Sequence, residues 1–445
     1  MKFKQFSSEI YIHTLVLAFI GLICSIHGED GVVFPVRIDK VYVLGNEQTK
    51  SYIILREIPY NFPDTLAQTD LLLIQNRIQN LYLFNRVELQ ISQQEEINAL
   101  IVMVTESWYI FPAPLLFINE HDWNKISYGL QLTHYNFRGR NEKVSFGGWL
   151  GYNPSFYVGY FNPWMGNKLR LIFGMGVSKN KVANRIFDFD EDRFGFNFTI
   201  GRKLSLNFDT QISFRYQRIK LPDSYKQYSV SGNGTDFVPR LSLQFKWDNR
   251  DLFEYPRKGF YLTYNIRRTG FTSNQPQFWR FEFDNRIYVP IYKKTSFALR
   301  QLFVFNKDKL PIYNRVFLGY SERIRGYFND VFPKPEMYET YNSTNISLTS
   351  LELRFPLFPI HYFTLDNGPI MASLYRDLKF GISGGFFMDS GIAWQYKRQF
   401  ALPNFYSGYG FGLHFHLPYV QVLRFDYAFN DKGRGELIID VRVAF

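Results

Sequence analysis

The sequence predicts a membrane protein of the all-β class: an antiparallel transmembrane β-barrel of about sixteen strands, preceded by one small α+β domain. Aromatic residues make up 19% of the 445 residues, with 47 Phe and 31 Tyr, although the charged fraction is an ordinary 20%. Phe, Tyr, Leu and Val alternate with Arg, Asp, Gln and Ser along most of the chain. This alternation is the period of a strand whose two faces meet different solvents.

The last ten residues, 436–445, show the alternation most clearly. Apolar residues occupy one face of this strand, namely Leu437, Ile439, Val441, Val443 and Phe445. Charged residues occupy the other face. An apolar outer face and a charged inner face suit a cylinder that has lipid outside and water inside. We therefore expect Val441, Val443 and Phe445 to form a carboxyl-terminal strand signal on the lipid face.

The amino terminus predicts export. Lys2 and Lys4 precede an apolar run over residues 11–23, and small and polar residues follow, so residues 1–28 are interpreted as a signal peptide. A retained anchor is the alternative. After residue 30, no stretch reaches the roughly 20 apolar residues that a spanning helix needs. The only cysteine, Cys24, lies within this segment, so we expect a mature chain without a disulfide.

The chain is basic, with a formal net charge of +11. Its Lys and Arg residues are scattered singly through strands and loops, a pattern that does not favour nucleic-acid binding. We expect these cations to meet lipopolysaccharide phosphates or to line a hydrated interior.

Residues 36–107 differ from everything that follows and predict a small α+β domain of about 70 residues. The expected order is strand, helix, helix, strand, strand, over residues 37–44, 50–58, 69–81, 87–91 and 99–106. The first strand stops at the turn pair Gly45-Asn46, and Thr49 is expected to cap the first helix.

Residues 108–445 contain about sixteen alternating segments, the first near residues 114–119. Most turns between them are short and polar. The exception is residues 306–345, a loop of about forty residues that lacks the alternation of a barrel strand. A loop of this length is uncommon unless it has a function.

That loop contains Ile324-Arg325-Gly326-Tyr327. One interpretation is a surface turn with Gly326 at positive φ. The other follows from strand parity, which places Glu352 and Asp389 on the lumenal faces of their strands because the apolar neighbours of each must face lipid. A loop folded into the barrel would bring Arg325 to one or both carboxylates, in a charge-assisted contact.

Three other polar patterns are candidate sites. Glu352 and Asp389 could instead act as a general acid and base, although no nucleophile or substrate cleft accompanies them. His414 and His416 share a strand face, but no third metal ligand is evident nearby. The glycines at positions 408, 410 and 412 describe a strand interior against which something packs closely. We expect no catalytic residue, metal or cofactor.

Nearly the whole mature chain resembles the BamA/TamA-type superfamily of outer-membrane assembly and secretion proteins, also called bacterial surface antigen barrels. Residues 36–107 resemble one POTRA domain, including its Gly45-Asn46 turn. Phe137-Arg138-Gly139-Arg140 resembles an early hairpin of the family's barrel, and the segment 247–259 resembles its D-x-R-D and P-x-x-G turn. Ile324-Arg325-Gly326-Tyr327 is similar to the family's V-R-G-[FY] motif in the sixth extracellular loop, whose arginine contacts acids that resemble Glu352 and Asp389.

The resemblance implies a non-enzymatic assembly factor that folds and inserts β-barrel proteins into the outer membrane of a Gram-negative bacterium, with its POTRA domain in the periplasm. The implied partners are unfolded outer-membrane or secreted polypeptides, outer-membrane lipids and lipopolysaccharide, and other periplasmic assembly factors. A polypeptide-export pore of the two-partner-secretion type for a dedicated substrate is the alternative, followed by a passive porin and, last, an outer-membrane enzyme. The chain has room for one POTRA domain, where general assembly factors usually carry several.

Overall fold

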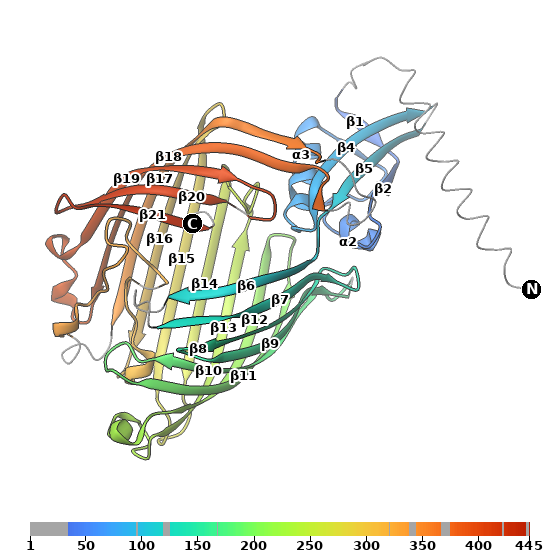
Figure 1. Ribbon diagram of the computed structural model, residues 1–445. Coiled ribbons are helices and arrows are strands. Elements are labelled where there is room, and N and C mark those ends of the chain that lie inside the picture. Colours follow the sequence, from blue (N-terminus) through green and yellow to red (C-terminus); the bar gives the residue numbers. More distant parts are fainter. Residues whose placement is uncertain are drawn as a thin grey trace, which may run out of the picture.

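The computed structural model describes residues 34–94, 97–118, 125–166, 168–319, 321–337, 344–365, 374–420, 422–441 and 445. The expected signal peptide over residues 1–28 and Val443 lie outside these residues. The predicted fold class is confirmed, since sixteen antiparallel strands form one continuous sheet that curves into a cylinder (Figure 1). No helix in the described part of the chain is long and apolar enough to cross a membrane.

A small α+β unit precedes the barrel. Its elements are β1 (Val36–Ile38), β2 (Lys40–Leu44), α2 (Ser51–Leu55), β3 (Asp64–Leu66), α3 (Gln68–Gln79), β4 (Phe84–Gln94) and β5 (Ile97–Glu106). β5 lies in the middle of a three-stranded sheet, parallel to β2 and antiparallel to β4. Ile53 and Ile54 of α2 and Ile74 and Ile78 of α3 are fully buried in the same core as Val102 of the sheet.

Two details of this unit differ from the sequence prediction. The expected strand over residues 37–44 is divided at Asp39, because β1 pairs with β3, a strand that the sequence pattern did not reveal. Thr49 does not cap α2. Instead its hydroxyl lies 2.9 Å from the Tyr109 hydroxyl and accepts a hydrogen bond of 2.9 Å from the Asn136 amide, so a contact with the barrel has taken the place of a local cap.

Each barrel strand pairs antiparallel with the strand that precedes or follows it in the chain. Its strands are β6 (Ile110–Ile118), β7 (Ile126–Phe137), β8 (Glu142–Gly151), β9 (Ser155–Met165), β10 (Leu171–Ala183), β11 (Asp190–Lys203), β12 (Phe208–Lys220), β13 (Thr235–Asp248), β14 (Gly259–Thr269), β15 (Phe278–Tyr292), β16 (Thr295–Lys307), β17 (Asn345–Phe363), β18 (Leu378–Trp394), β19 (Tyr406–His416), β20 (Leu423–Asn430) and β21 (Gly435–Val441). Short 3-10 turns occur at Asp223–Tyr228, Ile312–Asn314, Pro335–Met337, Lys397–Gln399 and Leu402–Asn404.

The first and last barrel strands are edges of the sheet. In the described residues β6 pairs only with β7, and β21 pairs only with β20. β6 begins at Ile110, four residues before the predicted start, and so contains Pro112 and Pro114. Proline is tolerated there because an edge strand has one side without a ladder partner.

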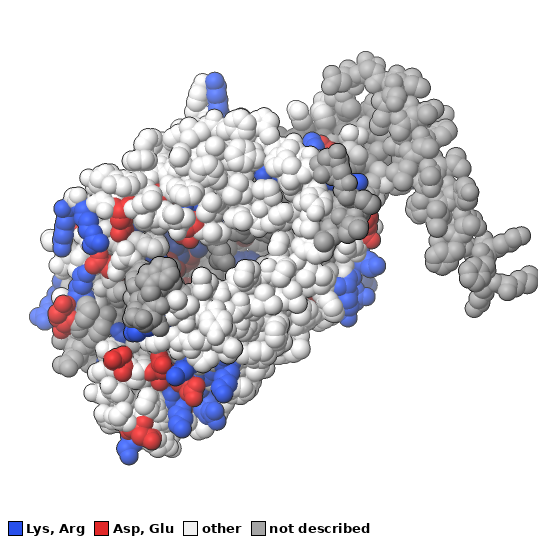
Figure 2. Space-filling model, in the orientation of Figure 1, with Lys and Arg blue, Asp and Glu red and all other residues white. Residues whose placement is uncertain are grey.

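Strand alternation separates an apolar outside from a polar inside. Large apolar side chains project outward from every part of the wall, and examples are Leu116, Tyr128, Phe146, Met175, Phe198, Ile212, Leu241, Phe386, Tyr409 and Ile439. Figure 2 shows a broad uncharged band on this face of the cylinder, with Lys, Arg, Asp and Glu gathered toward its two ends. This is the surface expected of a barrel in a bilayer.

The expected position of Phe445 is wrong. Its side chain is 2% exposed and lies against the inward-facing Tyr288. Arg354 donates to the Phe445 carbonyl oxygen over 3.2 Å, and its guanidinium carbon lies 5.2 Å from the centre of the ring. This hydrogen bond and cation–π contact hold the residue inside the barrel, where the alternation of β21 had predicted the lipid face.

The α+β unit contacts the turns at one end of the barrel, here called the proximal end (Figure 1). Lys50 N donates to Gly139 O over 2.9 Å, Arg77 Nη1 to Asn207 Oδ1 over 2.8 Å, and Asn80 Nδ2 to Asp251 O over 2.9 Å. Gly139 has φ +68°, and a Cβ there would lie 2.1 Å from Gln48 O, so only glycine permits this contact. The opposite end of the barrel is called the distal end.

Candidate functional site in the barrel lumen

The connection between β16 and β17, called the long loop (residues 308–344), begins at the distal end and folds back into the lumen. The inner faces of β16 and β17 are apolar there, through Leu302, Val304, Ile346 and Leu348. The loop residues that bury them are Leu318, Ile324, Tyr327 and Phe332. These apolar inner positions would face water if the loop were absent, so they form a binding surface for the loop, here called the apolar seat.

Arg325 joins the loop to the barrel wall. Its Nε donates to Asp389 Oδ2 over 2.7 Å and its Nη2 donates to Asp389 Oδ1 over 2.8 Å, a bidentate pair. Its Nη1 donates to Glu352 Oε2 over 2.8 Å. The structure thus brings together Arg325 and the two carboxylates singled out from strand parity.

The cluster is buried and its charges are balanced by further residues. Arg325, Glu352 and Asp389 are 5%, 1% and 2% exposed. Arg354 donates to the other oxygen of Glu352 over 2.7 Å, and Asp426 Oδ2 lies 3.5 Å from Arg325 Nη1. Burial lowers the pKa of a guanidinium, but the carboxylates of Asp389 and Glu352 outweigh burial, and the pKa of Arg325 lies above its ordinary value.

The residues beside Arg325 continue the attachment. Gly326 has φ +96°, as expected of a turn, but the turn lies inside the barrel. The backbone N–H groups of Gly326 and Phe328 both donate to Glu436 Oε1, over 2.9 and 2.7 Å. The Tyr327 hydroxyl donates to Asp431. The motif therefore contacts β17, β18, β21 and the turn before β21.

The glycines of β19 make room for the loop. A Cβ at Gly408 would lie 1.7 Å from Arg325 O, and one at Gly410 would lie 2.8 Å from the Phe387 ring. The Phe387 ring in turn lies 3.7 Å beneath the Arg325 guanidinium carbon. The expectation that something packs closely against this stretch is confirmed, and what packs there is the loop backbone.

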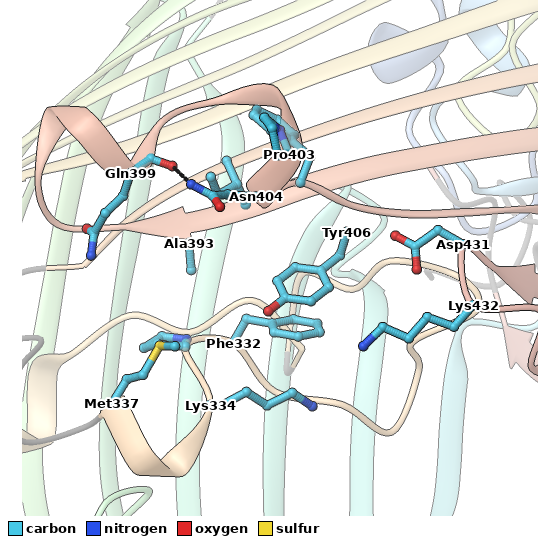
Figure 3. A pocket seen from close by; sticks show the side chains of 13 residues that line it. Phe332, Lys334, Met337, Ala393, Gln399, Pro403, Asn404, Tyr406, Asp431 and Lys432 are labelled. Atoms are coloured by element: carbon cyan, nitrogen blue, oxygen red, sulfur yellow. Dashed lines mark hydrogen bonds between the residues drawn. The ribbon is translucent and has the colours of Figure 1, made fainter.

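The distal face of the loop borders a cavity of about 610 Å³. Figure 3 shows the Phe332 ring beside the Tyr406 ring, with Lys334 and Lys432 on one side and Met337 on the other. The two rings stack with centroids 3.7 Å apart, so β19 holds the loop on this side as well.

His414 and His416 belong to the lumenal hydrogen-bond network. His414 Nδ1 lies 2.8 Å from the Tyr255 hydroxyl, and His416 Nε2 lies 2.9 Å from Ser383 Oγ. Within the described residues, no three His, Cys, Asp or Glu side chains are grouped to hold a metal ion. Both Glu352 and Asp389 are committed to arginines, so neither carboxylate is free to act as a base, and the cluster is a mechanical attachment.

Sequence reasoning missed Arg354, Asp426 and Glu436. The parity argument that selected Glu352 also places Arg354 on the lumenal face, so this residue was accessible from the sequence. Glu436 carries the same signal, as one of the charged residues opposite the apolar face of the last strand. Asp426 lay within a recognised strand, but nothing in its sequence neighbourhood indicates which lumenal cation it approaches.

Replacing Arg325 with Ala should detach the loop and lower activity, because it leaves the buried Asp389 without its cation. Breaking a buried pair in this way costs about 3–5 kcal/mol. When samples are heated to stepped temperatures before gel electrophoresis, the folded band should convert to the unfolded band at a markedly lower temperature. Arg323→Ala is the matched control: Arg323 is exposed and lies 4.1 Å from the Phe328 ring, a contact of about 0.5–1 kcal/mol. Equal losses in both variants would contradict attachment through Arg325.

Gly408→Ala should displace the loop without removing any charge, because its Cβ would overlap Arg325 O. Overpacking of this kind costs at least ~1–3 kcal/mol. Trypsin should then cleave in the folded barrel after Arg325, which is buried while the loop is attached. Gly159→Ala in β9 is the control, since its Cβ would have only Met175 O near it, at 3.8 Å. Protection of Gly408→Ala equal to that of Gly159→Ala would show that the loop backbone does not depend on this glycine.

Known proteins resemble the chain in family and fold. A model of the Omp85 superfamily domain matches residues 136–438, more than half of the chain. The crystal structure of BamA from Haemophilus ducreyi lacking POTRA domains 1–3 aligns with a TM-score of 0.52 and 16% identity, covering 91% of this chain and 83% of that one. CdiB from Escherichia coli aligns with a TM-score of 0.54 and 14% identity, covering 91% of this chain and 74% of that one.

Curated protein sequences give no match. At these identities the two structural likenesses support the fold, while the family model supports membership. The chain belongs to the Omp85 superfamily, the outer-membrane β-barrels of Gram-negative bacteria that insert or transport polypeptides and are not enzymes.

Proposed function

We propose that this protein is a BamA/TamA-like insertase, which folds and inserts β-barrel proteins into the outer membrane. In this proposal the α+β unit is a POTRA domain, and it lies with the proximal end of the barrel in the periplasm. The observation that carries the proposal is the unpaired seam between β6 and β21, where two strand edges face each other without a hydrogen-bond ladder in the described residues.

The direction of the backbone groups at this seam follows from the neighbouring ladders. Tyr135 N donates to Tyr109 O, so the backbone N–H and C=O groups of odd-numbered residues in β6 point toward β7. Those of even-numbered residues point toward the seam. Asn430 N donates to Arg434 O, so the backbone N–H and C=O groups of even-numbered residues in β21 point toward β20. Leu437 and Ile439 therefore direct their N–H and C=O groups toward the seam.

The two edges are chemically unequal. Pro112 and Pro114 occupy seam-facing positions of β6, where their missing N–H groups remove two donors. β21 presents both donors and acceptors. A full ladder between the edges cannot form, and β21 keeps groups that can pair with an incoming strand. An exposed edge of this kind can template another chain.

The seam is held at its proximal end and hollowed between the edges. The Phe111 ring of β6 lies 5.8 Å from the Tyr419 ring in the turn between β19 and β20. Figure 2 shows a recess between the two edges through which charged side chains of the lumen are visible. A client strand could reach lipid and lumen at once along this recess.

The α+β unit supplies a second edge for clients. β2 pairs with β5 on one side only, and its other side has no strand partner among the described residues. An unfolded client can add to such an edge by backbone hydrogen bonds before it reaches the seam.

Depletion followed by proteomics of the outer membrane tests the proposal. A broad loss of β-barrel proteins is expected of an insertase. Loss of one secreted product would instead indicate a polypeptide-export pore for a dedicated substrate. No loss of either, together with solute flux that survives deletion of residues 36–106, would indicate a passive channel.

The double variant Pro112→Val/Pro114→Val should close the seam, because it restores two N–H donors. Two hydrogen bonds contribute about 2 kcal/mol together, roughly a 30-fold shift in the opening equilibrium. Insertion of a urea-unfolded barrel client into proteoliposomes should slow by a similar factor. Ala113→Val, on the same strand with its donor intact, is the control. Unchanged insertion by a folded double variant would contradict the seam mechanism.

A further inference from the structure

A group of arginines lines the distal half of the lumen on the wall opposite the seam. This arginine belt comprises Arg193, Arg215, Arg240, Arg267 and Arg280, one from each of the adjacent strands β11 to β15. Each alternates with outward-facing neighbours such as Phe194, Phe214, Leu241, Ile266 and Trp279, so all five occupy lumenal positions.

The strand register sets like charges directly against each other. Arg215 is the cross-strand partner of Arg240 between β12 and β13, and Arg267 is the partner of Arg280 between β14 and β15. Like charges in directly opposed positions destabilise an antiparallel sheet. Two such pairs on neighbouring strands require a compensating negative charge.

The described residues supply only part of that charge. Arg193 is paired with Glu191, and Arg267 Nη2 lies 2.8 Å from Glu282 Oε2. Arg280 donates to the neutral acceptors Asn306 Oδ1 and Asn314 O, over 2.7 and 2.8 Å. Arg215 and Arg240 have no carboxylate within 4.0 Å among the described residues. Arg215, Arg240 and Arg280 thus have no carboxylate partner among the described residues.

Three arginines elsewhere in the lumen have carboxylate partners. Arg300 reaches both Asp284 and Glu322 over 2.8 to 2.9 Å, Arg286 pairs with Asp284, and Arg325 has Glu352 and Asp389. Each of these three arginines therefore has a carboxylate partner, which Arg215, Arg240 and Arg280 lack among the described residues.

Polar atoms without partners mark the same place. Arg240 Nε is shielded from solvent and has no hydrogen-bond partner. Thr269, which lies directly opposite Arg240 on β14, is fully buried, and its hydroxyl also has no hydrogen-bond partner. A cation and a hydroxyl thus occupy opposed positions of β13 and β14, and no described acceptor meets Arg240 Nε or the Thr269 hydroxyl.

We infer that the arginine belt binds a free tetrahedral oxyanion of the phosphate class, held by Arg215, Arg240 and Arg280. Guanidinium groups match oxyanions through paired N–H donors, and a multivalent anion balances three charges better than a single carboxylate does. A free ion is favoured over a lipid headgroup because β12 to β15 lie at the middle of the strand order, far from both edges of the seam.

The test uses the full chain in detergent, with inorganic phosphate titrated against chloride at matched ionic strength. Phosphate should raise the unfolding temperature saturably and give a calorimetric binding isotherm. Arg240→Gln and Arg215→Gln should each weaken phosphate binding at least tenfold. In chloride both variants should unfold at the same temperature as the parent or higher, because a repulsive pair has been removed.

Arg218→Gln is the matched control, because Arg218 is exposed on the outer face of the same strand, β12. It should bind phosphate as the parent does. The inference would be overturned by equal effects of phosphate and chloride, by equal losses in Arg218→Gln, or by stabilisation with an acidic peptide or phosphatidylglycerol micelles alone. If Arg240→Gln does not fold, Arg215→Gln, whose side chain faces the open lumen, decides the outcome.

Discussion

The buried guanidinium of Arg325 is the constraint on which much of the lumen depends. A positive charge held away from water is tolerated only if anions meet its donors with good geometry. Asp389 and Glu352 provide the anions, Arg354 balances the second oxygen of Glu352, and Gly408 leaves space for the loop backbone that carries the charge. The apolar inner faces of β16 and β17 depend on the same contact, because the loop covers them only while it is attached.

This attachment makes one side of the barrel wall unlike the other. β17, β18 and β21 are joined through the loop by buried ion pairs and backbone hydrogen bonds. Among the described residues, β6 has no such connection to the loop, and its prolines prevent a full ladder with β21. In the proposed function, we expect the wall to open along the seam between β6 and β21, where the described residues form no ladder.

Much of this architecture could be predicted from the sequence, because a two-residue period reports directly which side of a wall a residue faces. That rule selected the class of fold, the number of strands and the lumenal positions of Glu352 and Asp389. It failed where the chain leaves the period. Phe445 follows the alternation of β21 but is held inside by Arg354, and Thr49 has the composition of a helix cap but bonds to Tyr109. Such contacts join residues far apart in sequence, and no local pattern encodes them.

The contact between Gly326 and Glu436 has a consequence for how the molecule matures. The acceptor for the two loop amides belongs to β21, the strand at one edge of the barrel sheet. Docking of the loop tip cannot be completed until that strand has joined β20. Until then the loop tip lacks two of the hydrogen bonds that hold it in the lumen, so the order of strand pairing sets when the loop is fully attached.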